Sequence, residues 1–158
     1  MYENNYINSI NNGLIESTYK IEQKSIDLEP FFDLVNKLLI KVQKSHGRIF
    51  FFGNGASASF SNHMALDWSK NGGVLALSLS DSSMLTALAN DYSYDEAFVE
   101  FMKINKISTD DLVISTSSSG NSKNIVNVLN YCRQNNITSI GLSGLNSGNK
   151  TEEVANYS

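Results

Sequence analysis

Short apolar runs alternate with helical stretches from residue 48 onward, and this alternation is the feature that most constrains the fold. The runs cover residues 48–52, 74–79, 112–115 and 137–142, and none shows the apolar-polar alternation of a half-exposed strand. Such runs are typical of strands buried on both faces, and the intervening helices supply the crossovers that a parallel sheet requires. The sequence therefore predicts an α/β fold with a parallel sheet and flanking helices.

Two helices are expected to accompany this sheet, over residues 57–70 and 122–134. The second has apolar residues at i, i+3, i+4 and i+7, which form one face that can lie on a sheet. These residues are Ile125, Val128, Leu129 and Cys132. We therefore expect Cys132, the single cysteine, to pack in the core. Residues 151–155 resemble the start of another helix.

The N-terminal segment is predicted to form two further helices. Residues 4–24 carry Ile7, Ile10, Leu14 and Ile21 at helical spacing in a polar background. A second helix opens at Pro30, presents a continuous apolar stripe and ends at His46 and Gly47, where His46 is expected to be structural. We expect residues 1–46 to form a helical hairpin that belongs to the same domain as residues 47–158.

Length and charge exclude several classes of protein. The 158 residues are enough for one domain, and 12 Lys plus Arg against 16 Asp plus Glu give a net charge of -4. No basic cluster stands out, so nucleic acid is not expected as a direct partner. The longest apolar runs have four residues, far short of the roughly 20 needed to span a bilayer. A lone cysteine and an N-terminus without a secretory signal favour the cytoplasm.

Two serine- and glycine-rich turns are the candidate binding site. Residues 53–57 (Gly-Asn-Gly-Ala-Ser) follow the first run, and residues 116–122 (Thr-Ser-Ser-Ser-Gly-Asn-Ser) follow the third. Ligands of open parallel sheets bind beyond the carboxyl ends of the strands, where helix N-termini and backbone N–H groups attract phosphate. The turns therefore favour a phosphate monoester held by neutral donors. The alternative is that the serines, Ser122 above all, only cap helices.

A nucleotide cofactor is not expected. The first turn begins like the dinucleotide fingerprint G-x-G-x-x-G, but Ala58 stands at the third glycine and only Asp81 is a loose candidate for the acidic residue. The nucleotide P-loop is also absent, because no Gly-Lys-Ser/Thr ending follows.

His63 and Asp67 lie four residues apart on the predicted helix that follows the first turn. This spacing puts both side chains on one helix face, where they could act as acid and base or share a divalent metal ion. The alternative is a His-Asp pair on the surface or at a subunit interface.

Taken together, these motifs resemble the sugar isomerase (SIS) domain, and within it the phosphoheptose isomerases. The matching stretches are residues 53–57, 62–67, 80–81, 90–92 and 117–122. The resemblance implies a flavodoxin-like, doubly wound three-layer sandwich with five parallel strands, assembled as a homotetramer with active sites between subunits. It also implies that the sugar phosphate is held by Asn54, Ser57, Ser117, Ser118, Ser119 and Ser122, and that Asp91 contacts the sugar.

The resemblance further assigns the catalytic pair. His63 matches a histidine that binds zinc in some members, and Asp67 stands where these enzymes carry a catalytic glutamate, so both are candidate catalytic and zinc-binding residues. Aspartate is one methylene shorter than glutamate, so its carboxylate lies about 1 Å or more farther from the substrate. A displacement of about 1 Å can lower the rate on the order of a hundredfold. The family's last strand and C-terminal helix, which bears a catalytic glutamine and histidine, are expected to be missing.

The implied activity is conversion of sedoheptulose 7-phosphate to D-glycero-D-manno-heptose 7-phosphate for lipopolysaccharide or capsule precursors. Two alternatives stay open at this point. The first alternative is an isomerase that acts on another phosphosugar. The second is a non-catalytic SIS protein that binds a phosphosugar or a protein partner, like the replication-initiator-associating proteins.

Overall fold

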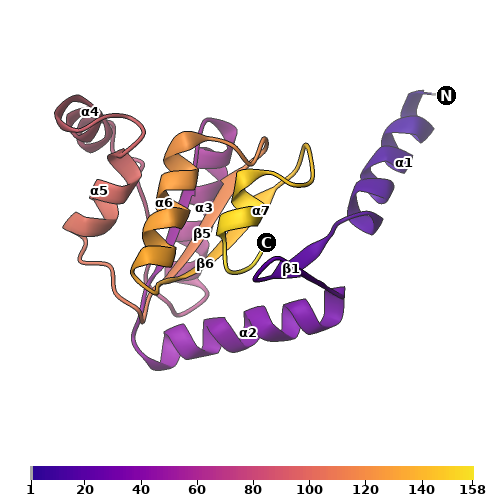
Figure 1. Ribbon diagram of the computed structural model, residues 1–158, viewed down its shortest axis with the longest axis horizontal. Helices are drawn as coiled ribbons and strands as arrows, with labels where there is room; N and C mark the ends of the chain where they lie inside the picture. Colours follow the sequence, from indigo (N-terminus) through magenta and orange to yellow (C-terminus); the bar gives the residue numbers. More distant parts are fainter. Residues whose placement is uncertain (1) are drawn as a thin grey trace.

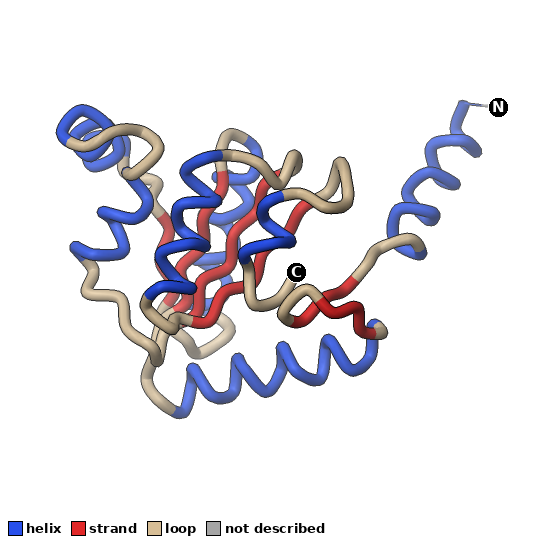
Figure 2. Tube along the Cα trace, in the orientation of Figure 1, coloured by secondary structure: helices blue, strands red, loops and turns tan. Residues whose placement is uncertain are grey.

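A parallel sheet lies at the centre of the computed structural model, which describes residues 2–158 except for the side chains of residues 2–4 and 14 (Figures 1 and 2). Each of the four predicted apolar runs forms a strand, and every neighbouring pair in the sheet is parallel. The predicted α/β class is therefore confirmed. In spatial order the strands are β4 (Ala76–Ser78), β3 (Ile49–Gly53), β5 (Leu112–Ser117) and β6 (Thr138–Ser143).

Helices cover both faces of the sheet and make a three-layer sandwich. On one face, α2 (Leu28–Lys44) and α3 (Ala56–Lys70) pack on the strand residues Ile49, Phe51 and Leu112. On the other face, α5 (Ala97–Ile104) and α6 (Lys123–Gln134) pack on Phe50, Phe52 and Val113. Two further helices are α4 (Ser82–Asp91), which precedes α5, and the short α7 (Lys150–Val154) near the C-terminus.

The chain adds strands to the sheet in opposite directions on the two sides of the β3–β5 pair. From β3 the chain passes through α3 to β4 on one side, whereas β5 lies on the other side of β3 and leads through α6 to β6. Because α3 and α6 cover opposite faces, their N-termini diverge from the same edge of the sheet. Gly53 of β3 pairs in register with Thr116 of β5, so the two serine-bearing turns begin level with each other. This is the topological switch point, where doubly wound folds bind ligands.

The single helix predicted over residues 4–24 is wrong in its second half. The helix α1 (Tyr2–Ile15) ends early, and β1 (Tyr19–Ile21) and β2 (Lys24–Ile26) form an antiparallel hairpin. Long-range contacts favour this hairpin, since the Tyr19 ring lies 5.1 Å from that of Phe31. The backbone of Lys20 also exchanges two hydrogen bonds with Ser158.

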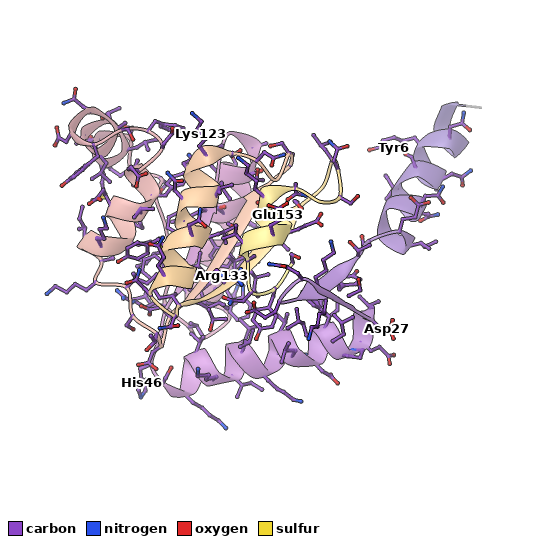
Figure 3. All side chains as sticks on the ribbon, in the orientation of Figure 1. Tyr6, Asp27, His46, Lys123, Arg133 and Glu153 are labelled. Carbon is purple, nitrogen blue, oxygen red and sulfur yellow. The ribbon has the colours of Figure 1, made fainter. Side chains whose placement is uncertain are left out.

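The two N-terminal helices are consequently not joined directly as a helical hairpin. Instead α1 projects from the body of the molecule, with Tyr6 exposed far from the sheet (Figures 1 and 3). The predicted stripe residue Leu14 has its side chain outside the described part. Among residues 2–158, none of the helices combines the length and apolar character needed to cross a membrane.

The implied fifth strand is not formed within the described residues. Tyr157 makes one isolated parallel bridge to Ile140 of β6 and one antiparallel bridge to Ile21 of β1. The C-terminal residues and the N-terminal hairpin therefore border the sheet beyond β6.

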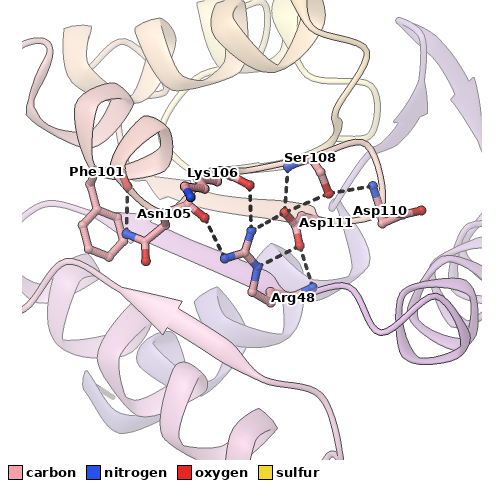
Figure 4. Close-up of polar contacts among 7 residues, drawn as sticks. All are labelled: Arg48, Phe101, Asn105, Lys106, Ser108, Asp110 and Asp111. Atoms are coloured by element: carbon pink, nitrogen blue, oxygen red, sulfur yellow. Dashed lines mark hydrogen bonds and ion pairs between the residues drawn. The ribbon is translucent and has the colours of Figure 1, made fainter.

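An ion pair joins β3 and β5 at the edge opposite the turns (Figure 4). The Asp111 side chain is 2% exposed, and its Oδ2 lies 2.8 Å from Nη2 of Arg48. Backbone N–H groups of Arg48 and Ser108 also donate to this carboxylate, each at 2.8 Å. Burial by itself raises the pKa of Asp111, but hydrogen bonds from the Arg48 side chain and the two backbone groups outweigh it, so the net pKa is lowered.

Candidate functional site

Ser117 and Ser122 face each other across the turn that links β5 to α6. Their Oγ atoms are 3.1 Å apart, with Ser117 buried at the strand end and Ser122 at the N-cap of α6. Ser118 and Ser119, between them, are exposed. Figure 3 labels the next residue, Lys123, at this end of α6. The structure thus gathers hydroxyl groups at a helix N-terminus, an arrangement suited to an anion.

The loop between β6 and α7, together with the start of α7, hydrogen-bonds to this turn. Both the backbone N–H and the hydroxyl of Thr151, which is fully buried, donate to the Gly120 carbonyl, at 2.9 and 3.0 Å. The Ser118 carbonyl accepts from the backbone N–H of Leu145 at 2.8 Å. Gly120 has φ +66, and a Cβ there would lie 2.0 Å from Oδ1 of Asn149. Only glycine therefore fits this position.

The turn between β3 and α3 brings Ser57 to the same edge. A Cβ on Gly53 would meet the Ser57 backbone at 2.6 Å, so the start of α3 passes directly over the strand end. Since Gly53 pairs with Thr116, Ser57 lies at the carboxyl end of the β3–β5 pair, as Ser117 does. The two turns therefore lie side by side at the carboxyl ends of these strands.

Asn124 and Tyr94 also belong to this site, although they were not predicted from the sequence. Asn124, in the first turn of α6, forms a reciprocal amide pair with Asn54, and Tyr94 donates to Asn54 Oδ1 at 2.9 Å. The sequence held one signal for Asn124: asparagine is a poor helix former, yet it stands in the first turn of α6. The Asn54 side chain is thus occupied mainly by protein partners.

Asp91 is the last residue of α4 and is exposed. Its carboxylate accepts from Asn90 Nδ2 at 3.1 Å, and no contact with the serines is recorded among the described side chains. Tyr94, three residues later, nevertheless ties this segment to the first turn through Asn54. A contact between Asp91 and a bound sugar stays a prediction.

His63 and Asp67 lie on one face of α3, as predicted. His63 Nε2 is 3.2 Å from Asp67 Oδ2, and the side chains are 68% and 44% exposed. His63 follows Ser57 by six residues, which is about 9 Å along the helix axis. The pair is therefore near the serine-bearing turns but open to solvent.

The zinc expectation can be tested against these donors. A catalytic zinc site takes three protein ligands, whereas His63 and Asp67 supply two. Within the described part of the chain, no group of three histidine, cysteine, aspartate or glutamate residues could hold a metal ion. The described residues of one chain thus do not complete a zinc site by themselves.

A separate cavity lies in a groove between α2, α3 and β6. Its volume is about 880 Å³, and its floor is apolar, formed by Phe51, Ile114 and Ile140 of the sheet. None of the candidate site residues lines it. This groove lacks the converging hydroxyl groups and helix N-termini of the two serine-bearing turns.

Comparison with known proteins agrees with these features. A family model described as the SIS domain matches residues 21–144. The chain is 32% identical to phosphoheptose isomerase 2 of Campylobacter jejuni, covering 96% of this chain and 79% of that protein. It is also 32% identical to a phosphoheptose isomerase of Helicobacter pylori, covering 86% of this chain and 76% of the relative.

Solved structures show the same relationship. The phosphoheptose isomerase of Neisseria gonorrhoeae superposes with a TM-score of 0.64 and 29% identity, covering 77% of this chain and 68% of the other. That of Francisella tularensis, at 21% identity, shares the fold with a TM-score of 0.79, over 98% of this chain and 79% of the other. The chain therefore belongs to the SIS-domain phosphoheptose isomerase family and is an isomerase.

Proposed function

We propose that the protein converts sedoheptulose 7-phosphate to D-glycero-D-manno-heptose 7-phosphate, in the cytoplasm, for lipopolysaccharide or capsule precursors. The observation that carries this proposal is the meeting of two serine-bearing turns at the switch point, each at the N-terminus of a helix. Hydroxyl and backbone N–H donors at such a place suit the phosphate of a sugar monoester. The names of the similar proteins supply the heptose.

The proposed chemistry is proton transfer within the substrate. A base removes a proton from C1 while the C2 carbonyl oxygen gains a proton, which gives an enediol. A proton then returns to C2 as the O1 hydroxyl loses its proton, so that the ketose becomes an aldose without net oxidation. We assign the base to Asp67 and an orienting role to His63, 3.2 Å away. The serines would fix the phosphate and thereby place C1 relative to α3.

The test is incubation of the full chain with sedoheptulose 7-phosphate, with and without added zinc, followed by NMR detection of the aldose anomeric proton. We expect turnover by the wild type, loss of turnover in Asp67→Ala, and activity in Asp67→Glu, which restores the missing methylene. Asp33→Ala removes a comparable exposed carboxylate from α2 and should leave the rate unchanged.

Exposure of His63 and Asp67 favours a second candidate, a phosphosugar-binding protein without turnover. Binding of the ester without aldose formation in the same experiment would support this candidate and contradict the isomerase. An aldose formed only from a different ketose phosphate would instead change the substrate and keep the chemistry.

We further propose that a homotetramer covers the catalytic face of α3. Phe60 and Leu66 lie on α3 close in sequence to the His-Asp pair and are 48% and 58% exposed, so they offer apolar surface that a second copy could cover. A second copy packed there would exclude water and is the natural source of a further zinc ligand.

Leu66→Glu tests the proposed tetramer. It should lower both the sedimenting mass and the turnover, because a charge would enter the buried interface. A wild type that sediments as a monomer yet turns over would contradict the proposed assembly.

A further inference from the structure

A reciprocal side-chain amide pair joins the two serine-bearing turns. Asn54 Nδ2 donates to Asn124 Oδ1 at 2.9 Å, and Asn124 Nδ2 donates to Asn54 Oδ1 at the same distance. Asn124 is 3% exposed, so these bonds are shielded from water. One partner lies in the β3–α3 turn and the other in the first turn of α6. The pair thus bridges segments 70 residues apart.

Most hydrogen-bonding groups of the two amides are already used within the protein and are not free to bind a ligand. Asn54 Oδ1 also accepts from Tyr94, and Asn124 Oδ1 also accepts from the backbone N–H of Ile125 at 3.0 Å. Both lone pairs of each amide oxygen are therefore used. Each amide nitrogen has one hydrogen left, and that of Asn124 is buried. The geometry therefore suits a link between turns better than a substrate contact.

The loop after α4 docks against the same link. Besides the bond from Tyr94, Asn127 Nδ2 on α6 donates to Glu96 Oε1 at 2.6 Å, and Lys123 Nζ lies 3.7 Å from Asp95 Oδ2. These contacts fix the loop that follows Asp91 against the start of α6. The amide pair is therefore the point at which three segments of the site meet.

We propose that Asn54, Asn124 and Tyr94 act as a clamp that sets the spacing between the two turns and so positions the bound phosphate. The pairing of Gly53 with Thr116 sets the strand ends level, but α3 and α6 then leave the sheet on opposite faces, and the amide pair is a direct side-chain link between the two turns beyond that point. A phosphate that bridges both turns needs its donors held within about 0.5 Å of the productive geometry. Asn124 and Tyr94 are then positioning residues. This inference rests on the proposed phosphate cradle.

The experiment measures dissociation constants by calorimetry, for inorganic phosphate and for sedoheptulose 7-phosphate, on the full chain. The variants are Asn54→Ala, Asn124→Ala, the double variant, and Tyr94→Phe, which removes only a hydroxyl from a half-exposed ring. Asn156→Ala is the matched control, because Asn156 also bridges two segments through its amide but lies away from the turns. Thermal unfolding reports the folded state of each variant.

We expect Asn124→Ala to weaken binding of both ligands about tenfold, and Tyr94→Phe about threefold, as for a small misplacement of binding groups. The double variant should lose no more affinity than Asn124→Ala, because residues that act as one unit are non-additive. Asn156→Ala should lower the unfolding temperature while leaving affinity unchanged. If Asn124→Ala does not fold, Tyr94→Phe alone decides the matter.

Wild-type affinity in both Asn124→Ala and Tyr94→Phe would overturn the clamp, as would additive losses in the double variant. These outcomes are distinct from failure of the isomerase proposal, in which the wild type binds the ester but forms no aldose. A wild type that binds neither ligand would overturn the clamp and the phosphate cradle together.

Discussion

Cys132 illustrates how burial sets the chemistry of a single residue. It is fully buried on the sheet-facing side of α6, as predicted, and burial raises the pKa of its thiol to about 12. Because the thiolate is the reactive form, we expect no labelling by a disulfide reagent in the native protein at about pH 8 and rapid labelling after unfolding in urea. Fast stoichiometric labelling of the native protein would contradict this account.

Gly120 offers a sharper test at the same scale. Gly120→Ala should destabilise the protein by about 2–3 kcal/mol. Alanine is strained in the left-handed backbone conformation of this position, and its Cβ would also collide with Asn149. Gly148→Ala is the matched control, since Gly148 has φ +69 but nothing within 4 Å of an added Cβ. It should cost only about 1 kcal/mol. Equal losses in urea unfolding would show that the Asn149 contact is unimportant.

Among single residues, the sequence identified the hydroxyl groups and Asn54, but not its amide partner Asn124. Ser57, Ser117 and Ser122 were recognisable because serines cluster after strands and before helices. Asn124 was not, because its role depends on Asn54, which is 70 residues away in the chain. A pairing of this length has no local pattern.

At the scale of elements, the Arg48–Asp111 pair should make the β3–β5 junction sensitive to acid. Asp111 has a lowered pKa in the folded protein, so its stabilising contribution is complete above the unfolded pKa and is lost as pH falls below about 4. We expect Asp111→Asn to cost about 3 kcal/mol near neutral pH, because it leaves Arg48 without its counter-charge. Urea unfolding at several pH values should show this cost shrinking toward about pH 3.

Asp110→Asn is the control for this pair, since the neighbouring Asp110 side chain is exposed and forms no ion pair with Arg48. It should change stability by less than about 0.5 kcal/mol. A cost of Asp111→Asn that does not vary between about pH 3 and neutrality would contradict the proposed linkage.

The local periodicity of apolar residues was enough to predict most helices and strands. Its failure near the N-terminus has a physical cause. Buried strands and amphipathic helices have periodicities that are visible in a short window. The β1–β2 hairpin is instead held in part by Ser158, which exchanges two backbone hydrogen bonds with Lys20 and lies far outside any window that includes residues 19–26. Tertiary contacts therefore decided a segment whose sequence also fits a helix.

At the scale of the whole molecule, the site depends on strand order. The sequence predicted that two phosphate-binding turns follow strands, but their adjacency follows from β3 and β5 being neighbours at the switch point. The spacing of His63 and Asp67 was likewise visible, whereas their exposure was not. Whether another subunit covers this pair depends on the assembly of several chains, and no local sequence pattern predicts that assembly.

The central claim is that both turns bind one phosphate, and a crystal structure of the full chain with sedoheptulose 7-phosphate tests it most directly. The account predicts phosphate oxygens within hydrogen-bonding distance of Ser57 on one side and of Ser117 or Ser122 on the other. A phosphate that touches only one turn, or that lies in the apolar groove between α2 and α3, would contradict it.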